Sequence, residues 1–214
     1  MKAWFFYESS GVMREAFRAL GHDAWSCDLL PADDGSPFHR QGDAHEVIRE
    51  VIAGGGCDLM GFHPPCTYVN GAGIHWNNRG RGWEKTEQSI EEIRWLLGLD
   101  VVSYLENPVG IISTRIRRPD QIIQPYEYGE DASKKTCLWL KGLPLLQSTQ
   151  WVPPRIVNGK SRWANQTDSG QNRLGPSATR WKQRSRTYPG IAAAMAKQWS
   201  LAICKKTHQL PSLL

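Results

Sequence analysis

The chain has 214 residues, of which 40% are hydrophobic and 22% charged, the composition of a globular protein with one hydrophobic core. No apolar run approaches the roughly 18 residues of a membrane-spanning helix, and the first residues do not predict a signal peptide. Five cysteines without a Cys-x-x-Cys pair exclude a disulfide framework and a structural zinc site. We therefore expect a single domain over residues 1–214 in a reducing cytoplasm, with no membrane and no metal.

Charge is distributed unevenly along the chain. The net charge is +5, but residues 1–150 carry 15 basic and 20 acidic side chains, whereas residues 151–206 carry 11 basic side chains and one acid, Asp168. A basic segment on an acidic body favours a polyanionic partner such as DNA. Ordinary solvated surface charge is the alternative. Aromatic residues between the charges, such as Trp181 and Tyr188, favour nucleic acid, although most of the ten tryptophans are expected in the core.

The first 110 residues alternate between patterns typical of strands and of helices. Strands are expected at Ala3–Tyr7, Ala24–Leu29, Asp58–Phe62 and Val101–Leu105, and helices at Gly11–Leu20, His45–Ile52 and Glu84–Leu99. Repeated β-α-β units of this kind predict an α/β fold with a mostly parallel sheet and helices on both faces.

The pattern weakens beyond residue 110. A further strand is expected at Thr136–Lys141 and a last helix at Ile191–Cys204. Residues 150–189 between them are basic, polar and rich in turn signals. We expect this segment to be a long substrate-binding loop or a partly disordered arm within the single domain.

Ligands bind outside the carboxyl ends of parallel strands, so the residues that follow each expected strand are candidates for a site. These residues are Glu8-Ser9-Ser10-Gly11, Asp28, His63-Pro64-Pro65-Cys66 and Glu106-Asn107-Pro108, with Gly42-Asp43 just ahead of the second helix. Each segment alone is common in turns, helix caps or cores. Their order and spacing together are informative.

These segments resemble the motifs of the cytosine-C5 DNA methyltransferases. Phe6 to Gly11 lies where that family has a Phe-x-Gly-x-Gly-Gly turn, and Pro64-Pro65-Cys66 resembles its Pro-Cys motif. Tyr104-Leu105-Glu106-Asn107-Pro108 resembles its Glu-Asn-Val motif, with Pro in place of Val. The Pro-Cys and Glu-Asn pair is the specific part of the resemblance.

The resemblance implies a Rossmann-like fold that depends on S-adenosyl-L-methionine, and transfer of a methyl group to C5 of cytosine in DNA. Cys66 and Glu106 would be catalytic, as would Arg184 and Arg186 of a shifted Gln-x-Arg-x-Arg motif. The donor would be bound by Phe6, Glu8, Ser10, Gly11, Asp28, Asp43 and Pro64, and the substrate by Pro65, Asn107, Pro108 and Trp181. The helix over residues 190–204 would pack back near the cofactor site.

The chemistry of this reaction sets requirements for two side chains. A thiolate that adds to C6 of cytosine makes C5 nucleophilic, and a proton on N3 stabilises the adduct. We therefore expect burial to raise the pKa of Glu106 so that it can donate a proton. A nearby Lys or Arg is expected to lower the pKa of the Cys66 thiol.

The chain also departs from the family pattern. Glu8 and Ser10 replace two glycines of the first turn, and Thr67 follows Cys66 where the family has Gln. Residues 107–189 are too few for a full target-recognition domain, so sequence specificity is expected to be low or narrow. Such a pared-down chain is similar to small phage- or prophage-encoded methylases, which act in the cytoplasm of a bacterial or phage-infected cell.

Three alternatives to methylation of DNA remain at this stage. The first is pyrimidine C5 modification of another substrate, a nucleotide or RNA. The missing recognition domain favours this alternative, but the basic segment argues against a free nucleotide. The second is a modified form of the donor, since Glu8 and Arg14 alter the charge around it. The third is a non-catalytic nucleic-acid-binding homologue. The sequence predicts neither the target sequence nor the oligomeric state.

Overall fold

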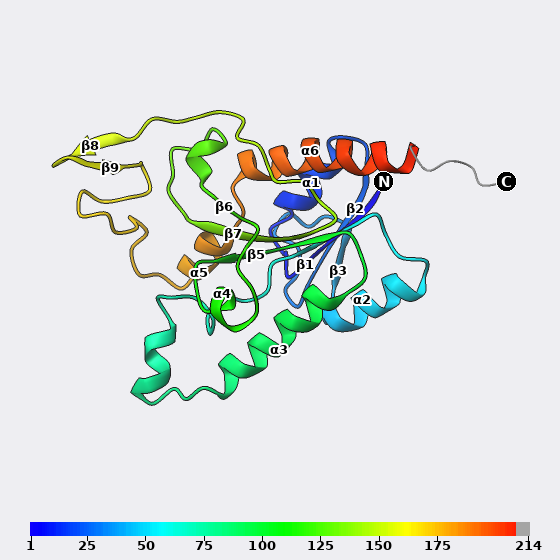
Figure 1. Ribbon diagram of the computed structural model, residues 1–214, viewed down its shortest axis with the longest axis horizontal. Helices are drawn as coiled ribbons and strands as arrows, with labels where there is room; N and C mark the ends of the chain where they lie inside the picture. Colours follow the sequence, from blue (N-terminus) through cyan, green and yellow to red (C-terminus); the bar gives the residue numbers. More distant parts are fainter. Residues whose placement is uncertain (209–214) are drawn as a thin grey trace.

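A seven-stranded sheet in the order β3-β2-β1-β4-β5-β7-β6 forms the centre of the computed structural model, which describes residues 1–208 (Figure 1). Strands β1 to β5 are parallel, whereas β7 runs antiparallel to both β5 and β6. The strands are β1 Lys2–Phe6, β2 Asp23–Asp28, β3 His39–Gln41, β4 Leu59–Phe62, β5 Ser103–Pro108, β6 Gln121–Ile123 and β7 Thr136–Lys141. The predicted α/β class with a mostly parallel sheet is therefore confirmed.

Helices cover both faces of this sheet, as a sheet of mainly parallel strands requires (Figure 1). One face carries α1 Val12–Arg18 and α6 Pro189–His208, and the other carries α2 Ala44–Ala53 and α3 Glu84–Gly98. Shorter pieces are the helices α4 Ile112–Arg115 and α5 Arg180–Ser185 and the 3-10 turns η1 Ile74–Arg79 and η2 Pro125–Glu127. No helix within residues 1–208 combines the length and the hydrophobicity that a bilayer-spanning segment needs.

Two hydrophobic cores result, one on each face of the sheet. Alternate residues of β5 divide between them, because side chains of a strand point to opposite faces: Tyr104 joins the core under α1 and α6, and Leu105 the core over α2 and α3. All four residues of β4 are buried. Helix α3 contributes Ile90, Ile93 and Leu96 at the helical spacing that its sequence showed.

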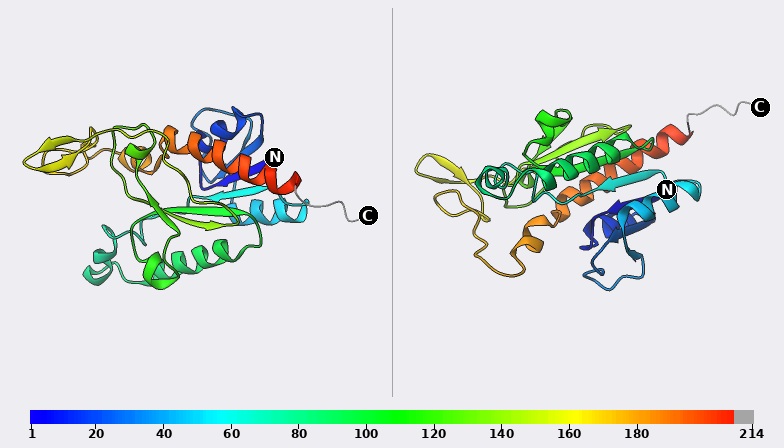
Figure 2. Two further views of the ribbon diagram at one scale, coloured as in Figure 1. Left: turned by 45° about the horizontal axis from the view of Figure 1, so that its top comes forward. Right: turned by 90° about the horizontal axis from the view of Figure 1, so that it is seen from below.

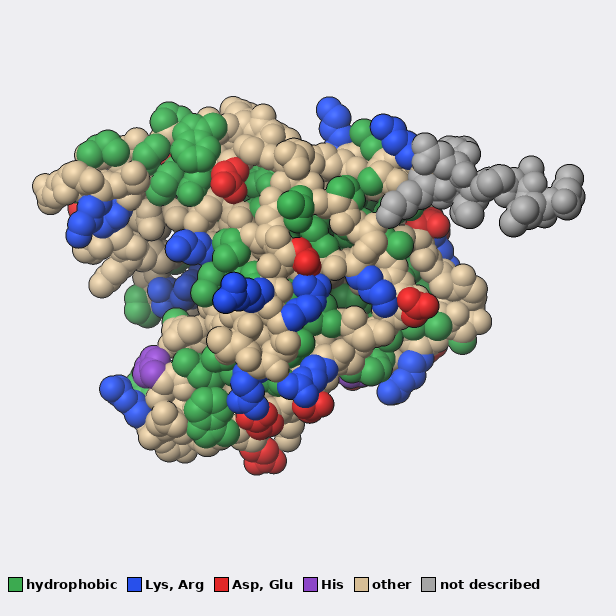
Figure 3. Space-filling model, viewed as in Figure 1, with side chains coloured by type: hydrophobic (Ala, Val, Ile, Leu, Met, Phe, Trp, Pro, Cys, Tyr) green, Lys and Arg blue, Asp and Glu red, His purple; other side chains and the backbone are tan. Residues whose placement is uncertain are grey.

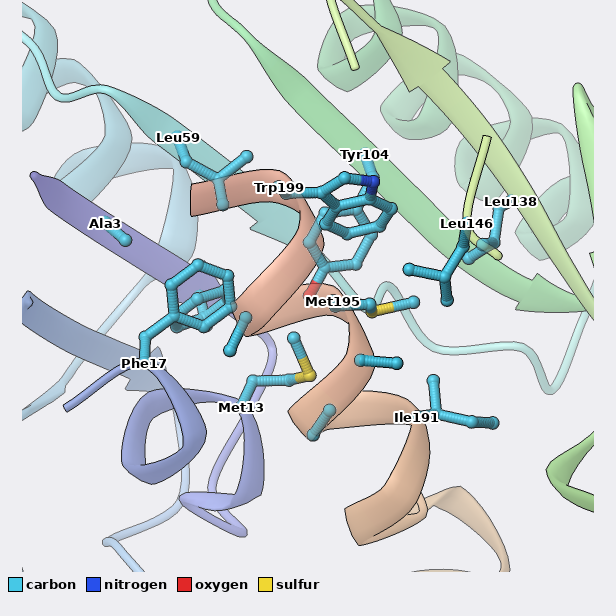
Figure 4. Close-up of a cluster of buried hydrophobic side chains, with 14 of the residues drawn as sticks. Ala3, Met13, Phe17, Leu59, Tyr104, Leu138, Leu146, Ile191, Met195 and Trp199 are labelled. Carbon is cyan, nitrogen blue, oxygen red and sulfur yellow. The ribbon is translucent and has the colours of Figure 1, made fainter. Parts of the chain in front are cut away.

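Helix α6 lies deep in the first core. Its alanines 192, 194 and 196 are buried and small, so the helix backbone can lie close to the sheet and to α1. Trp199 fills the remaining space: its ring is fully buried, and its Nε1–H donates to the carbonyl oxygen of Pro144 at 3.0 Å. Figure 4 shows Trp199 beside Tyr104 and Met195 in this core.

The segment over residues 150–189 is ordered into small elements. It contains a two-stranded hairpin of β8 Arg155–Val157 and β9 Lys160–Arg162, followed by loops and by α5. The hairpin extends away from the main sheet (Figures 1 and 2). Asp168 connects the loop that follows the hairpin to β8, because it accepts a hydrogen bond from Arg155 Nη1 at 2.5 Å.

Most element boundaries agree with the predictions to within about two residues, but β5 is shifted. It begins at Ser103 rather than Val101 and continues through Glu106, Asn107 and Pro108. Glu106 and Asn107 therefore lie within the strand, paired with Leu138 and Cys137 of β7, and do not follow it as a loop. The short strands β3, β6, β8 and β9 were not predicted.

Candidate functional site

The sheet has its topological switch point between β1 and β4, because the chain leaves β1 in one direction for β2 and returns to β4 on the other side. In open α/β sheets this is where ligands bind. Backbone hydrogen bonds connect the loops there: His63 N–H donates to the carbonyl oxygen of Phe6 at 3.1 Å, and Glu8 N–H to that of Cys27 at 3.1 Å. The predicted donor-binding and catalytic segments therefore meet at one edge of the sheet.

The loop after β1 is closed by its own side chains. Glu8 Oε1 accepts hydrogen bonds from the Ser10 hydroxyl and from Val12 N–H, the latter at 3.1 Å, and so caps the N-terminus of α1. Gly11 has a φ of 73°, and a Cβ there would collide with the guanidinium of Arg14. Arg14 is itself fully buried and bonded to Ser26 and Asp34. Side chains thus fix the conformation of this loop.

Glu8 also carries a buried charge without a full set of partners. The residue is 4% exposed, and its second oxygen, Oε2, has no hydrogen bond within residues 1–208. Burial raises the pKa of Glu8 above its ordinary value, and the hydrogen bond from Ser10 and the charges of His63 and Arg14 offset this in part. A buried acceptor without a partner is costly, which marks this position as a place for a ligand.

The remaining donor-binding predictions have different surroundings. Phe6 is fully buried against Phe62, so its ring packs in the core and does not face the edge where the loops meet. Asp28 is half-buried, and burial raises its pKa. Asp43 is exposed and caps α2, since its Oδ1 accepts from the N–H groups of residues 45 and 46. The N–H of Gly42 donates to the carbonyl oxygen of Asp28 at 2.9 Å and keeps the two acids close.

Asn107 holds the loop that carries Cys66. Its Nδ2 donates to the carbonyl oxygen of Pro64 at 2.9 Å, and its buried Oδ1 has no partner within residues 1–208. Pro64 is buried and Pro65 exposed, while Cys66 is partly exposed at the end of this stiff turn. The side chain of Asn70 donates to the carbonyl oxygen of Cys66 at 2.7 Å. These hydrogen bonds therefore fix the backbone that carries the sulfur of Cys66.

Glu106 differs from the expectation for a proton donor. Burial pushes its pKa upward, but the charge of Lys134 and the hydrogen bond from His63 outweigh burial, so the pKa lies below its ordinary value. His63 Nδ1 is 3.3 Å from Glu106 Oε2. The expected upward shift was wrong, because two basic side chains surround this carboxyl group and no local pattern in the sequence indicates them.

The thiol of Cys66 also differs from the expectation. Burial and the nearby charge of Glu106 raise its pKa, and the side-chain hydrogen bond of Asn70 and the charge of Lys134 offset only part of this rise. The expected cation is present, as Lys134, but the net shift is upward instead of downward. The resting cysteine is therefore mainly a thiol at neutral pH.

The predicted arginines lie elsewhere. Arg184, in α5, and Arg186, directly after it, are both exposed, and so is Trp181 at 60%. Neither arginine contributes to the pKa of Glu106; Lys134, just before β7, is the cation that does. The two arginines face solvent beside the site, where they can contact a polyanion but do not brace Glu106 in this conformation.

A small cavity lies behind Glu106. Its volume is about 10 Å³, the limit for one ordered water, so it does not admit a nucleobase. Ile191 and Met195 of α6 line it together with Tyr188 and Glu106, which shows that the last helix closes against the predicted catalytic residue. Elsewhere within residues 1–208, no group of three or more His, Cys, Asp or Glu side chains is arranged to hold a metal ion.

Three further side chains belong to this site: His63, Tyr104 and Lys134. His63 and Tyr104 were included in the motif segments but were given no role there, and Lys134 was not predicted. Lys134 lies just before β7, and the antiparallel pairing of β7 with β5 places Thr136, the first residue of β7, opposite Pro108. This pairing joins distant parts of the sequence, so no local pattern predicts it.

No protein-family model matches the chain, and no curated protein is similar to it.

Proposed function

We propose that this protein transfers a methyl group from S-adenosyl-L-methionine to C5 of cytosine in DNA, through a covalent adduct with Cys66. One observation carries the proposal: Asn107 Nδ2 donates to the carbonyl oxygen of Pro64 and so brings the loop of Cys66 beside the strand of Glu106, near enough for Glu106 and Lys134 to shift the pKa of the thiol. This pair is a nucleophile and a proton-transfer group of the kind that addition to a pyrimidine ring needs. The resemblance of the surrounding motifs supports it.

The residues at the ends of β1 and β2 fit a donor of this kind. Glu8 Oε2 is a buried acceptor without a partner, and its negative charge suits a cationic ligand such as one with an amino and a sulfonium group. Asp28 would hold ribose hydroxyls, and Asp43 an adenine amino group. When bound, the donor supplies an electrophilic methyl group.

The protein's own residues perform the rest of the proposed reaction. The thiolate of Cys66 attacks C6, on a loop that Asn107 holds through the carbonyl oxygen of Pro64. Glu106 moves a proton to and from N3. Lys134 partly offsets the cost of two negative groups, the thiolate and the carboxylate, in one small space.

The decisive experiment is covalent trapping on DNA that contains 5-fluorocytosine, with S-adenosylmethionine present. Fluorine at C5 cannot leave as a proton does, so the adduct with Cys66 persists and is seen as a protein–DNA species on a denaturing gel. We expect an adduct with the natural protein and with Cys204→Ala, whose cysteine lies partly exposed on α6. Cys66→Ala should give none, and equal trapping by Cys66→Ala would contradict the covalent mechanism.

A second candidate function is DNA binding without catalysis. It is supported by the raised pKa of the Cys66 thiol, which lowers the fraction of thiolate, and a protein that only binds DNA does not need a thiolate. Donor titration separates the two. An enzyme is expected to bind S-adenosylmethionine, and Asp28→Asn should weaken that binding by about 1–3 kcal/mol. Asp43→Asn should do the same while it keeps the cap of α2, because Asn is an equally good cap.

A further inference from the structure

A buried chain of hydrogen bonds lies directly behind Glu106. His63 Nδ1 is 3.3 Å from Glu106 Oε2, and His63 Nε2 is 2.9 Å from the hydroxyl oxygen of Tyr104. The side chains of His63 and Glu106 are 9% and 11% exposed, and Tyr104 is fully buried. Both ring nitrogens therefore have a protein partner, and the imidazole has one fixed orientation.

Gly61 makes room for this chain. A Cβ at position 61 would lie 2.6 Å from the hydroxyl oxygen and the adjoining ring atoms of Tyr104, so Tyr104 can cross β4 here because residue 61 is glycine. On its other side Tyr104 packs on Trp199 of α6, with ring centroids 4.9 Å apart (Figure 4). Its ring meets His63 edge to face at 5.5 Å. Packing thus aims the hydroxyl group at the imidazole.

Glu106 needs a proton source for the proposed reaction. A carboxylate that is surrounded by Lys134 and His63 is a poor donor by itself, yet N3 of the pyrimidine must gain a proton when sulfur bonds to C6. His63 is the titratable group that touches the carboxylate directly. It lies on the side of Glu106 that is closed off by α6, since both line the small cavity with Ile191 and Met195.

We propose that His63 is a positioning residue that supplies, through Glu106, the proton that N3 of the target pyrimidine receives. The inference rests on the proposed function and deepens it. The imidazolium passes its Nδ1 proton to Glu106 Oε2, and the carboxyl group passes a proton to N3 while the thiolate of Cys66 bonds to C6. The C5=C6 electron pair moves between C4 and C5, and the C4=N3 pair binds the proton. His63 ends neutral with its remaining proton on Nε2, Glu106 ends ionised, and proton exchange with solvent restores the resting Nδ1–H form of the ring.

Several charged or titratable groups face His63 from the elements packed around it. Glu8 comes from the loop after β1, Tyr104 and Glu106 from β5, Lys134 from the segment before β7, and Tyr188 from the segment before α6. Tyr104 can donate its hydroxyl proton to Nε2 while the Glu106 carboxylate accepts from Nδ1. In the resting, neutral ring this arrangement keeps the proton on Nδ1, on the side of Glu106, and the imidazolium that acts in the proposed step forms when Nε2 takes a second proton.

The first test does not depend on activity. The ¹⁵N chemical shifts of the His63 ring, assigned by comparison with His63→Gln, show which nitrogen carries the proton of the neutral imidazole at pH 8. We expect the proton on Nδ1 in the natural protein, and a mixture of tautomers in Tyr104→Phe, which keeps the ring packing but removes the hydroxyl group. A proton on Nε2 in the natural protein would overturn the inference.

The second test is the pH dependence of adduct formation on 5-fluorocytosine DNA. Without His63, Glu106 must take its proton from solvent, which becomes slower as pH rises. His63→Gln should therefore be about 100-fold slower than the natural protein at pH 8 and much less impaired at pH 6, with unchanged DNA affinity. His45→Gln is the matched control, because His45 pairs with Glu92 at 3.2 Å and has no hydrogen bond or ion pair with Glu106 within residues 1–208. It should retain the natural profile.

The outcomes separate the two proposals. If the natural protein forms an adduct and His63→Gln is slowed equally at both pH values, His63 is structural and the inference is overturned while the proposed function stands. If the natural protein forms no adduct at Cys66, the proposed function fails and the proton route to N3 fails with it. A loss that grows with pH in His63→Gln, absent in His45→Gln, supports both.

Discussion

Cys66, Glu106 and Lys134 share a small space at the edge of the sheet, and their charges act on one another. The carboxylate makes the thiolate harder to form, and the ammonium group makes it easier. The same ammonium group lowers the pKa of Glu106. At neutral pH these effects leave Cys66 mainly as a thiol and Glu106 as a carboxylate.

This balance predicts opposite effects of two substitutions on the thiol. Glu106→Gln removes a negative charge and should lower the pKa of Cys66, whereas Lys134→Gln removes a positive charge and should raise it, each by about 1 unit. The rate of alkylation by iodoacetamide, followed against pH by peptide mass spectrometry, measures the shift. Cys204 in the same samples is the internal control and should not change. Shifts of the same sign in both variants would contradict the arrangement.

Glu8 gives a second prediction at this scale, one of stability. Because its pKa is raised in the folded protein, the folded state holds this proton more tightly than the unfolded state does. Stability from this group is thus present below the unfolded pKa and is lost as pH rises toward the folded pKa. Glu8→Gln should be more stable than the natural protein by about 1–3 kcal/mol at pH 8, with a smaller difference at pH 5.

Urea denaturation of both proteins at the two pH values tests this prediction. Glu46→Gln, which alters an exposed carboxylate in the first turn of α2, should show no such pH-dependent difference. A Glu8→Gln protein that is less stable at pH 8 would mean that Oε2 has a partner when the protein is in solution. Weaker binding of a cationic donor by the stabilised variant would identify the unpartnered charge as a functional one.

The roles of single residues were only partly predictable. Cys66, Glu106, Asp28 and Asp43 could be placed at one edge because each lies near a strand end in a parallel sheet, and the structure brings them there. The acid–base properties could not be predicted, since they depend on Lys134, which reaches the site through a long-range strand pairing, and on the contact of His63 with Glu106. Phe6 was predicted to bind the donor from its place in the motif, but its ring is buried against Phe62 in the core.

At the scale of elements, α6 connects the core with the site. The helix packs on α1 and the sheet through Trp199 and Met195, and its first turn lines the cavity behind Glu106. Its sequence predicted a helix by the spacing of apolar residues. Its small alanines allow the close approach, but the partner across that interface is set by the sheet order, which a single sequence does not reveal.

The packing of α6 predicts unequal effects of two tryptophan substitutions. Trp199→Ala removes a fully buried ring and its hydrogen bond to the carbonyl oxygen of Pro144, so it should lower the free energy of unfolding by about 3–5 kcal/mol. Trp181→Ala removes a ring that is 60% exposed in α5 and should change stability by about 0.5 kcal/mol or less. Thermal and urea unfolding measure both, and equal losses would contradict the placement of α6.

At the scale of the whole molecule, the most basic part of the sequence also contains the hairpin that extends away from the main sheet. The basic residues 151–206 include the hairpin of β8 and β9 and helix α5, and on the face drawn in Figure 3 hydrophobic side chains gather where the hairpin lies, with basic side chains beside them and over the rest of this face. Two of these cations are paired within the protein, since Arg155 contacts Asp168 and Lys182 contacts Asp33. Arg184 and Arg186 have no ion pair within residues 1–208, and they stay available for a polyanion.

This distribution predicts that neutralising Arg184 and Arg186 together weakens DNA binding about equally for all sequences. Each lost phosphate contact should reduce the slope of log Kd against log salt by about 0.9, so the double variant to Gln should flatten it by up to about two contacts. Lys85→Gln with Arg118→Gln is the matched control, because it removes the same charge from exposed positions outside residues 151–206. If the arginines instead stabilised the fold through the acidic body, the double variant would lose thermal stability and keep the natural slope. Parallel slopes would contradict DNA binding by this segment and favour a nucleotide as the substrate.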